Sequence, residues 1–113
     1  MNRTVRLELP NPARRAPVAG QVVLALAIAS GTGPLVGERL RRAVQRVAAE
    51  AEGVLTIDAI AERGRLELEL SASPDGGWAD RAVARLDQYD VERTPKGVAV
   101  RVHRASLRRV PDV

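Results

Sequence analysis

Hydrophobic and polar positions alternate with two different periods along this chain, and the changes of period divide it into eight elements. Period-two alternation or short apolar runs between turn residues predict five strands, at 4–9, 54–61, 66–70, 90–93 and 98–103. Apolar residues at helical spacing predict three helices, at 13–30, 35–52 and 78–88. The predicted order is therefore β-α-α-β-β-α-β-β.

This order predicts an α+β fold. A mixed, mostly antiparallel sheet of about five strands, with three helices on one face, buries every apolar stripe in a two-layer sandwich. We expect one domain over residues 1–104, followed by a basic C-terminal tail at 105–113. Pro17 is expected in the first turn of the first helix, where its missing N–H costs little.

Two features have simple structural interpretations. Gly31-Thr32-Gly33 resembles part of a phosphate loop, but it lacks the following lysine and the preceding strand, so a turn between helices is expected. Trp78 stands at the start of the third helix and is expected in the core. His103 alternates onto the outer side of the last strand and is expected at the surface.

Composition narrows the classes of function. The 113 residues are 45% hydrophobic, which supports one domain with a real core. With no cysteine and one histidine, the chain has no disulfide framework, and a histidine-built metal site or a Ser-His-Asp triad is disfavoured. No apolar run approaches the ~20 residues that span a bilayer, and the start does not resemble a signal peptide. A cytoplasmic protein without a membrane partner is expected.

The net charge of +4 raises the possibility of nucleic-acid binding. Arg101, Arg104, Arg108 and Arg109, together with the second helix, could contact phosphates in a salt-dependent way. The chain has only one Trp and one Tyr, so it offers no stacking platform for single strands, and it carries no helix-turn-helix or zinc signature. Nucleic-acid binding is therefore retained only as an alternative.

The stretch from Ser71 to His103 carries a family resemblance. A glycine turn is followed by a helix with Val83-Ala84-Arg85-Leu86, an acidic strand Val91-Glu92-Arg93, and an alternating strand that opens with Gly97. This order resembles the C-terminal half of a GHKL-type ATP-binding domain, the fold of histidine-kinase catalytic domains and of small anti-sigma-factor serine kinases. The likeness is one of pattern and spacing, and it covers about residues 4–103.

The residues that would serve nucleotide chemistry in that family are replaced or displaced here. On the second helix, Arg46 stands at the place of the activating glutamate, and Glu50 at the place of the Mg²⁺-binding asparagine. Arg46 cannot accept a proton at neutral pH, because its guanidinium stays charged. The alternative for this pair is a solvated ion pair between Arg46 and Glu50.

The adenine end departs from the family in the same way. Ser71 or Ala72 occupies the place of the adenine-binding aspartate, and Asp75 comes about three positions late, before Gly76 and Gly77. About seven residues separate the central strand from the third helix, too few for a lid. Asp-Gly-Gly is also an ordinary turn composition. Finally, the Gly-Thr pair of the family is Gly97-Val98, which lacks the supporting hydroxyl.

The resemblance therefore predicts a non-catalytic regulatory module that keeps the fold and has lost nucleotide chemistry. No catalytic residue, metal site or cofactor is predicted. The implied partner is a sigma factor, an anti-sigma antagonist, a related kinase or a second copy of the chain. The alternative is a divergent ATP-binding anti-sigma serine kinase that uses Mg-ATP. In that case Glu50 would hold the metal, and Asp75, Gly76, Gly77 and Gly97 would contact the nucleotide.

Overall fold

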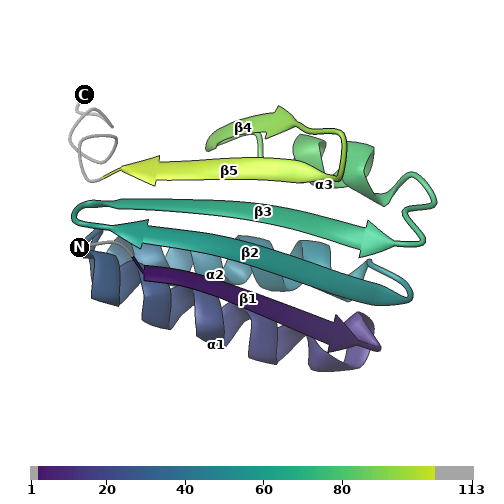
Figure 1. Ribbon diagram of the computed structural model, residues 1–113, viewed down its shortest axis with the longest axis horizontal. Coiled ribbons are helices and arrows are strands. Elements are labelled where there is room, and N and C mark those ends of the chain that lie inside the picture. The colour runs from purple at the N-terminus through teal and green to yellow at the C-terminus, as the bar shows by residue number, and fades with distance from the viewer. Residues whose placement is uncertain (1–2, 104–113) are drawn as a thin grey trace.

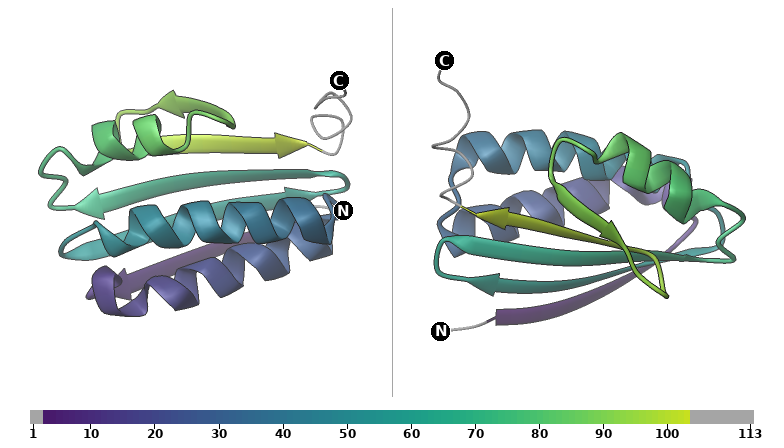
Figure 2. Two further views of the ribbon diagram at one scale, coloured as in Figure 1. Left: turned by 180° about the vertical axis from the view of Figure 1, so that it is seen from behind. Right: turned by 90° about the horizontal axis from the view of Figure 1, so that it is seen from above.

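Three helices cover one face of a five-stranded sheet in the computed structural model, which describes residues 3–103 (Figures 1 and 2). The strands are β1 (Arg3–Pro10), β2 (Val54–Glu62), β3 (Arg65–Ser73), β4 (Asp90–Arg93) and β5 (Val98–His103). The helices are α1 (Pro12–Ser30), α2 (Pro34–Ala49) and α3 (Trp78–Arg85). The predicted α+β class and the order of the elements are confirmed.

The sheet has the strand order β1-β2-β3-β5-β4, and every neighbouring pair is antiparallel. Because side chains alternate across a strand, each strand turns one set of residues towards the helices. These inward residues are apolar, as the period-two pattern predicted: Leu55, Ile57, Ala59, Leu66, Leu68, Leu70, Val98, Val100 and Val102. The core therefore lies between the sheet and the helices.

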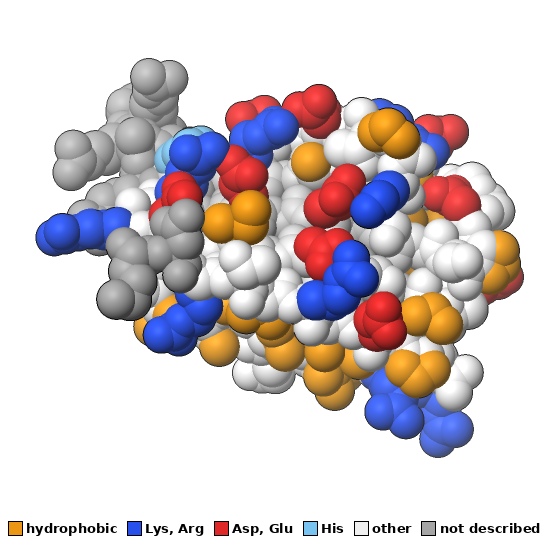
Figure 3. All heavy atoms as spheres, in the orientation of Figure 1, with side chains coloured by type: hydrophobic (Ala, Val, Ile, Leu, Met, Phe, Trp, Pro, Cys, Tyr) orange, Lys and Arg blue, Asp and Glu red, His pale blue; other side chains and the backbone are white. Residues whose placement is uncertain are grey.

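The opposite face of the sheet is polar and is crossed by ion pairs (Figure 3). Arg6 of β1 makes two hydrogen bonds to Asp58 of β2, of 2.7 and 3.1 Å. Arg101 of β5 donates to Glu92 of β4 at 2.7 Å. These pairs follow the register of the strands. Arg6 is directly opposite Asp58, and Glu92 is opposite Ala99, so that Glu92 and Arg101 are diagonal neighbours. This face of the sheet is therefore exposed to solvent, and the face that packs against the helices is the apolar one.

Several element boundaries differ from the sequence-based predictions. β3 continues three residues further, to Ser73, because Ala72 and Ser73 still pair with the first residues of β2. α2 ends at Ala49 and α3 at Arg85, each three residues earlier than predicted. Pro17 lies inside α1 rather than in its first turn, because Pro12 already occupies the first helical position.

The predicted turn between the first two helices is confirmed. Gly31 ends α1 in the left-handed conformation, with φ of 81°. The predicted domain limit at residue 104 and the tail at 105–113 lie outside the described residues. Of the helices that the structure describes, none is long and apolar enough to cross a membrane.

Candidate functional site

Glu50, the residue at the predicted metal-binding place, is already engaged by the fold. It caps the C-terminus of α2, and its carboxylate accepts hydrogen bonds from the Nε and Nη2 of Arg85 on α3, at 2.8 and 2.6 Å. The expected pairing of Glu50 with Arg46 is therefore wrong, because Arg85 reaches across from α3. This ion pair links the C-terminal ends of two helices, which is a structural role.

Asp75, Gly76 and Gly77 form the turn that starts α3. The Asp75 carboxylate accepts a hydrogen bond from the Ala79 N–H at 3.2 Å, and its carbonyl accepts from the Trp78 N–H at 2.9 Å. Gly76 and Gly77 have φ of 57° and 85°, a left-handed conformation that favours glycine. The fold thus explains this sequence as a turn that caps a short helix.

Gly97 is explained by close packing. A Cβ at this position would lie 2.0 Å from the carbonyl oxygen of Leu70 on β3. The turn is closed by Thr94, whose Oγ1 accepts from the Gly97 N–H at 2.9 Å while its own N–H donates to the Gly97 carbonyl at 2.9 Å. Gly97 thus lies beside β3. The Asp75–Gly77 turn is at the N-terminus of α3, whereas Glu50 contacts Arg85 at its C-terminus. The structure does not gather the predicted nucleotide residues into one site.

Trp78 is buried in the core beside α2. It is 1% exposed, and its indole Nε1 donates a hydrogen bond to the Val47 carbonyl in the last turn of α2, at 2.8 Å. Its expected place in the core is confirmed. Glu50, the metal ligand of the alternative prediction, is paired with Arg85, and the indole of Trp78 packs beside α2. Among the described side chains, no three potential metal ligands come together.

A cavity lies between α2 and the segment that leads from α3 into β4. Its volume is about 530 Å³. Its lining residues come from α2, from the α3–β4 connection and from the end of β5: Val36, Arg39, Arg42, Ala43, Arg46, Gln88, Tyr89, Asp90, Arg101, Val102 and His103. We call it the α2 groove. Its lining combines apolar residues such as Val36 and Ala43 with charged and polar ones.

Three arginines of α2 line one side of this groove. Arg39, Arg42 and Arg46 are spaced by three and four residues, so they follow one stripe of the helix. Within residues 3–103, Arg39 and Arg46 make no ion pair, and Arg42 makes one contact of 3.5 Å to Glu38. Glu38 is shared with Arg41, whose hydrogen bonds lower the pKa of its carboxyl. The stripe therefore carries an excess of positive charge.

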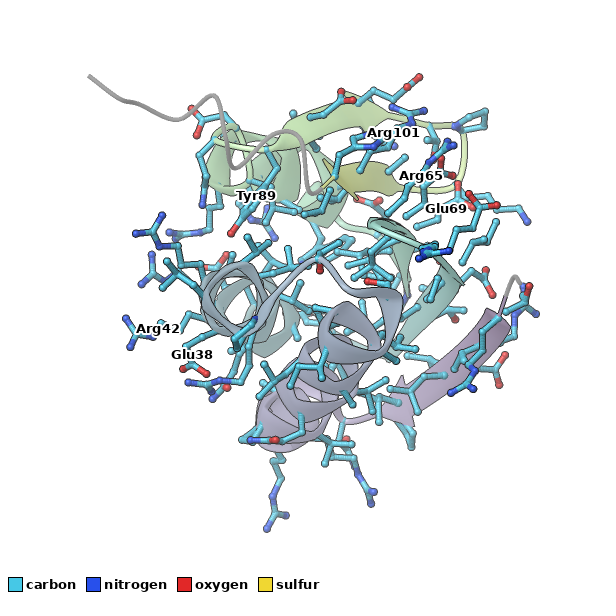
Figure 4. The ribbon with its side chains drawn as sticks, turned by 90° about the vertical axis from the view of Figure 1, so that its left-hand side faces the viewer. Glu38, Arg42, Arg65, Glu69, Tyr89 and Arg101 are labelled. Atoms are coloured by element: carbon cyan, nitrogen blue, oxygen red, sulfur yellow. The ribbon has the colours of Figure 1, made fainter. Side chains whose placement is uncertain are left out.

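Tyr89 supplies the polar group opposite this stripe. Figure 4 shows Tyr89 and Arg42 on the helical side of the sheet. Burial raises the pKa of the Tyr89 phenol, against the opposing effect of nearby Arg39, so the phenol is protonated at neutral pH. It can donate a hydrogen bond to an anion held by the arginines. Chemically, the groove suits a carboxylate or phosphate attached to an apolar group.

Arg101 does not add to this charge. Figure 4 shows it beyond the sheet, near Arg65 and Glu69. Its guanidinium lies 2.7 Å from Glu92, 3.8 Å from Asp90 and 4.0 Å from Glu67. Arg101 nevertheless lines the α2 groove together with the arginines of α2, so nucleic-acid binding stays an alternative. Arg104, Arg108 and Arg109 lie outside the described residues.

Sequence reasoning missed the α2 groove. It treated the second helix only as a surface that could contact phosphates, and it gave no role to Gln88 or Tyr89. The available signal was the spacing of the arginines next to Val36 and Ala43. His103 takes an outward position opposite Arg65, as expected, and is half-buried. Comparison with known proteins gives no matching family model and no matching curated protein.

Proposed function

We propose that this chain is a non-catalytic protein-interaction module that uses the α2 groove to bind an acidic segment of a protein partner. In the terms of the family that it resembles, the partner would be a sigma factor, an anti-sigma antagonist or a related kinase. The observation that carries the proposal is the arginine stripe of the groove, where Arg39 and Arg46 have no ion pair within the described chain. The loss of nucleotide chemistry is part of the proposal.

The groove favours a peptide carboxylate for two reasons. An arginine without a partner can hold a carboxylate by two parallel hydrogen bonds, a geometry that lysine cannot provide. The neighbouring apolar residues, Val36 and Ala43, offer a surface for the side chain that follows the acid. An acidic segment with apolar residues between its charges would use both properties.

The test is an NMR titration of the isotopically labelled chain with an acidic peptide of alternating Glu and Leu residues, compared with the same peptide carrying Gln for Glu. We expect the acidic peptide to shift the amide signals of α2 and of Gln88–Asp90, while the neutral peptide leaves them unchanged. The double variant Arg39→Gln/Arg46→Gln should weaken binding at least tenfold. The double variant Arg14→Gln/Arg15→Gln, which removes the same charge at the start of α1, should not.

Three other results would overturn the proposal. Equal binding of the neutral peptide would show that the arginines are not used. Micromolar binding of Mg-ATP, with shifts around Asp75–Trp78, would favour the alternative of a divergent serine kinase. Binding of duplex DNA that persists at physiological salt and is lost in the Arg39→Gln/Arg46→Gln variant would assign the groove to nucleic acid.

A further inference from the structure

A second surface of the molecule is apolar where solvent should favour polar residues. No charged residue occurs between Arg15 and Glu38, a stretch that includes most of α1. A helix that covers a sheet normally turns a polar face outwards. In α1 the outward face carries Val18, which is 46% exposed, and Ile28, which is 56% exposed, with Ala25 and Ala29 between and beside them. Between Val18 and Ala29 the one exposed polar residue of this face is Gln21, so the face is mainly apolar.

The strand next to α1 has one edge without a partner strand. β1 is the first strand of the sheet, and its eight residues pair with β2 in an unbroken register without a bulge. Its inward residues Val5 and Leu7 are only partly buried. Long, regular edge strands present unpaired N–H and C=O groups, and proteins usually protect them with bulges, short length, charged side chains, proline or a cover. β1 carries charges and ends at Pro10, but it has no bulge and is not short. The other edge strand, β4, has only four residues.

These two features lie on the same side of the molecule. α1 runs alongside β1 in Figure 1, and Figure 4 shows the two elements at the same lower edge of the two layers. Figure 3 shows hydrophobic side chains gathered along this edge. We define the β1–α1 face by the free edge of β1 together with Val18, Ala25, Ile28 and Ala29 of α1.

We propose that the β1–α1 face binds a second copy of the chain through a two-fold axis, with β1 pairing antiparallel with the β1 of the partner. The hydrogen-bonding direction along β1 supports this arrangement. Asn11, directly after the strand, donates its N–H to Gly53 of the segment before β2. Since alternate residues of a strand face the same side, Leu9, Leu7 and Val5 direct their main-chain groups to β2. Thr4, Arg6 and Glu8 direct theirs to the free edge.

The charges on β1 are self-complementary in this arrangement. If Leu7 lies on the two-fold axis, Arg6 of one copy is opposite Glu8 of the other, and the same pair forms a second time. Each pair joins opposite charges across the strands, which stabilises pairing. Glu8 makes no ion pair within the described chain, so it is available. This order of charges thus favours pairing with a second β1 over pairing with a strand whose charges are ordered differently.

The size of the face agrees with a dimer. Eight strand residues extend about 26 Å, and the 19 residues of α1 about 28 Å. With a depth of roughly 20 Å for the two layers, the face measures about 540 Å² per partner, or about 1,080 Å² in total, just above the ~1,000 Å² expected of a biological interface. The small side chains of Ala25 and Ala29 allow the two α1 helices to approach to about 8 Å, the lower end of the range for helix pairs. This proposal is independent of the α2 groove, which lies on other elements.

The first test is the molecular mass in solution, measured by sedimentation over a range of concentrations. We expect the chain to show twice its mass of 12.2 kDa at micromolar concentration. Ile28→Lys and Glu8→Arg should each weaken self-association at least tenfold. Asp87→Arg, which makes the same charge change at an exposed residue after α3, should leave it unchanged. A monomer at all concentrations up to about 100 µM, or a dimer that persists in Ile28→Lys and Glu8→Arg, would overturn the proposal.

Two further measurements test the same axis if a single variant proves unstable. Arg6→Glu and Glu8→Arg should each be monomeric alone but should form a mixed dimer when combined, because both cross-strand pairs are then attractive. The chain has no cysteine, so Leu7→Cys introduces a single thiol at the proposed axis. Facing positions of this kind are about 4.5 Å apart between Cα atoms, within disulfide range. Mild oxidation should cross-link this variant nearly completely and an Asp87→Cys control hardly at all. The reverse result would exclude this axis.

Discussion

Replacement of Trp78 tests whether its indole is enclosed beside α2. The residue is 1% exposed and lies at the start of α3, between that helix, α2 and the sheet. Trp78→Ala removes the largest fully buried side chain, and such changes typically cost 3–5 kcal/mol. Against a total stability of about 5–15 kcal/mol for a domain, this is a large fraction.

Trp78→Phe separates the hydrogen bond from the packing. Phenylalanine cannot donate to the Val47 carbonyl, which now receives the indole N–H at 2.8 Å. That carbonyl still accepts the Glu50 N–H at 3.2 Å, so it is not left without a donor. The expected cost is therefore about 1 kcal/mol for the hydrogen bond, together with roughly 1 kcal/mol for the smaller ring.

The assay is urea unfolding followed by far-UV circular dichroism, because both variants lack the only tryptophan. Leu35→Ala, at a residue that is 60% exposed, serves as the control and should change the free energy of unfolding by less than about 0.5 kcal/mol. A loss below about 1 kcal/mol for Trp78→Ala would refute the reasoning, because it would mean that the indole is not enclosed.

Two other substitutions test particular contacts. Gly97→Ala should lower the free energy of unfolding by about 2 kcal/mol or more, because its Cβ would meet the Leu70 carbonyl at 2.0 Å; a value near that of the exposed Leu35→Ala control would contradict the close packing. Asp58→Asn tests the pair with Arg6, whose hydrogen bonds lower the pKa of the Asp58 carboxyl below its ordinary 3.8. The stabilisation is therefore complete above about pH 4 and is lost as the pH falls through the lowered pKa. The variant should have a lower urea midpoint than the original chain at pH 6, and the two midpoints should converge towards pH 2; a difference that is the same at both pH values would count against the pair.

Most of the fold follows from local sequence patterns. Period-two alternation in Leu66, Leu68 and Leu70 is sufficient to predict a strand with one buried face, and the structure places all three in the core. Boundaries were less accurate, because they depend on partners. β3 extends to Ser73 because Ala72 and Ser73 pair with the first two residues of β2. Pro17 lies inside α1 because the helix already begins at Pro12.

The candidate sites show the limit of the same reasoning. A family pattern directed attention to Glu50 and Asp75, which are polar residues next to turns. The Asp75 side chain accepts a hydrogen bond from Ala79 at the start of α3, four residues later, whereas the Glu50 carboxylate pairs with Arg85, which is 35 residues away. Conversely, Tyr89 has no sequence pattern that marks it. It becomes part of a site only because the chain after α3 passes beside the arginines of α2.

The sequence by itself therefore determined the elements, their order and the buried face of each one, because these depend on periodicity within a few residues. Tertiary structure alone decided which polar groups are used internally and which remain available. An ion pair, an enclosed indole and an uncovered helix face all depend on residues far apart in the chain. The outward apolar face of α1 is the clearest case: its composition predicts burial, and only the packed fold places it at the surface.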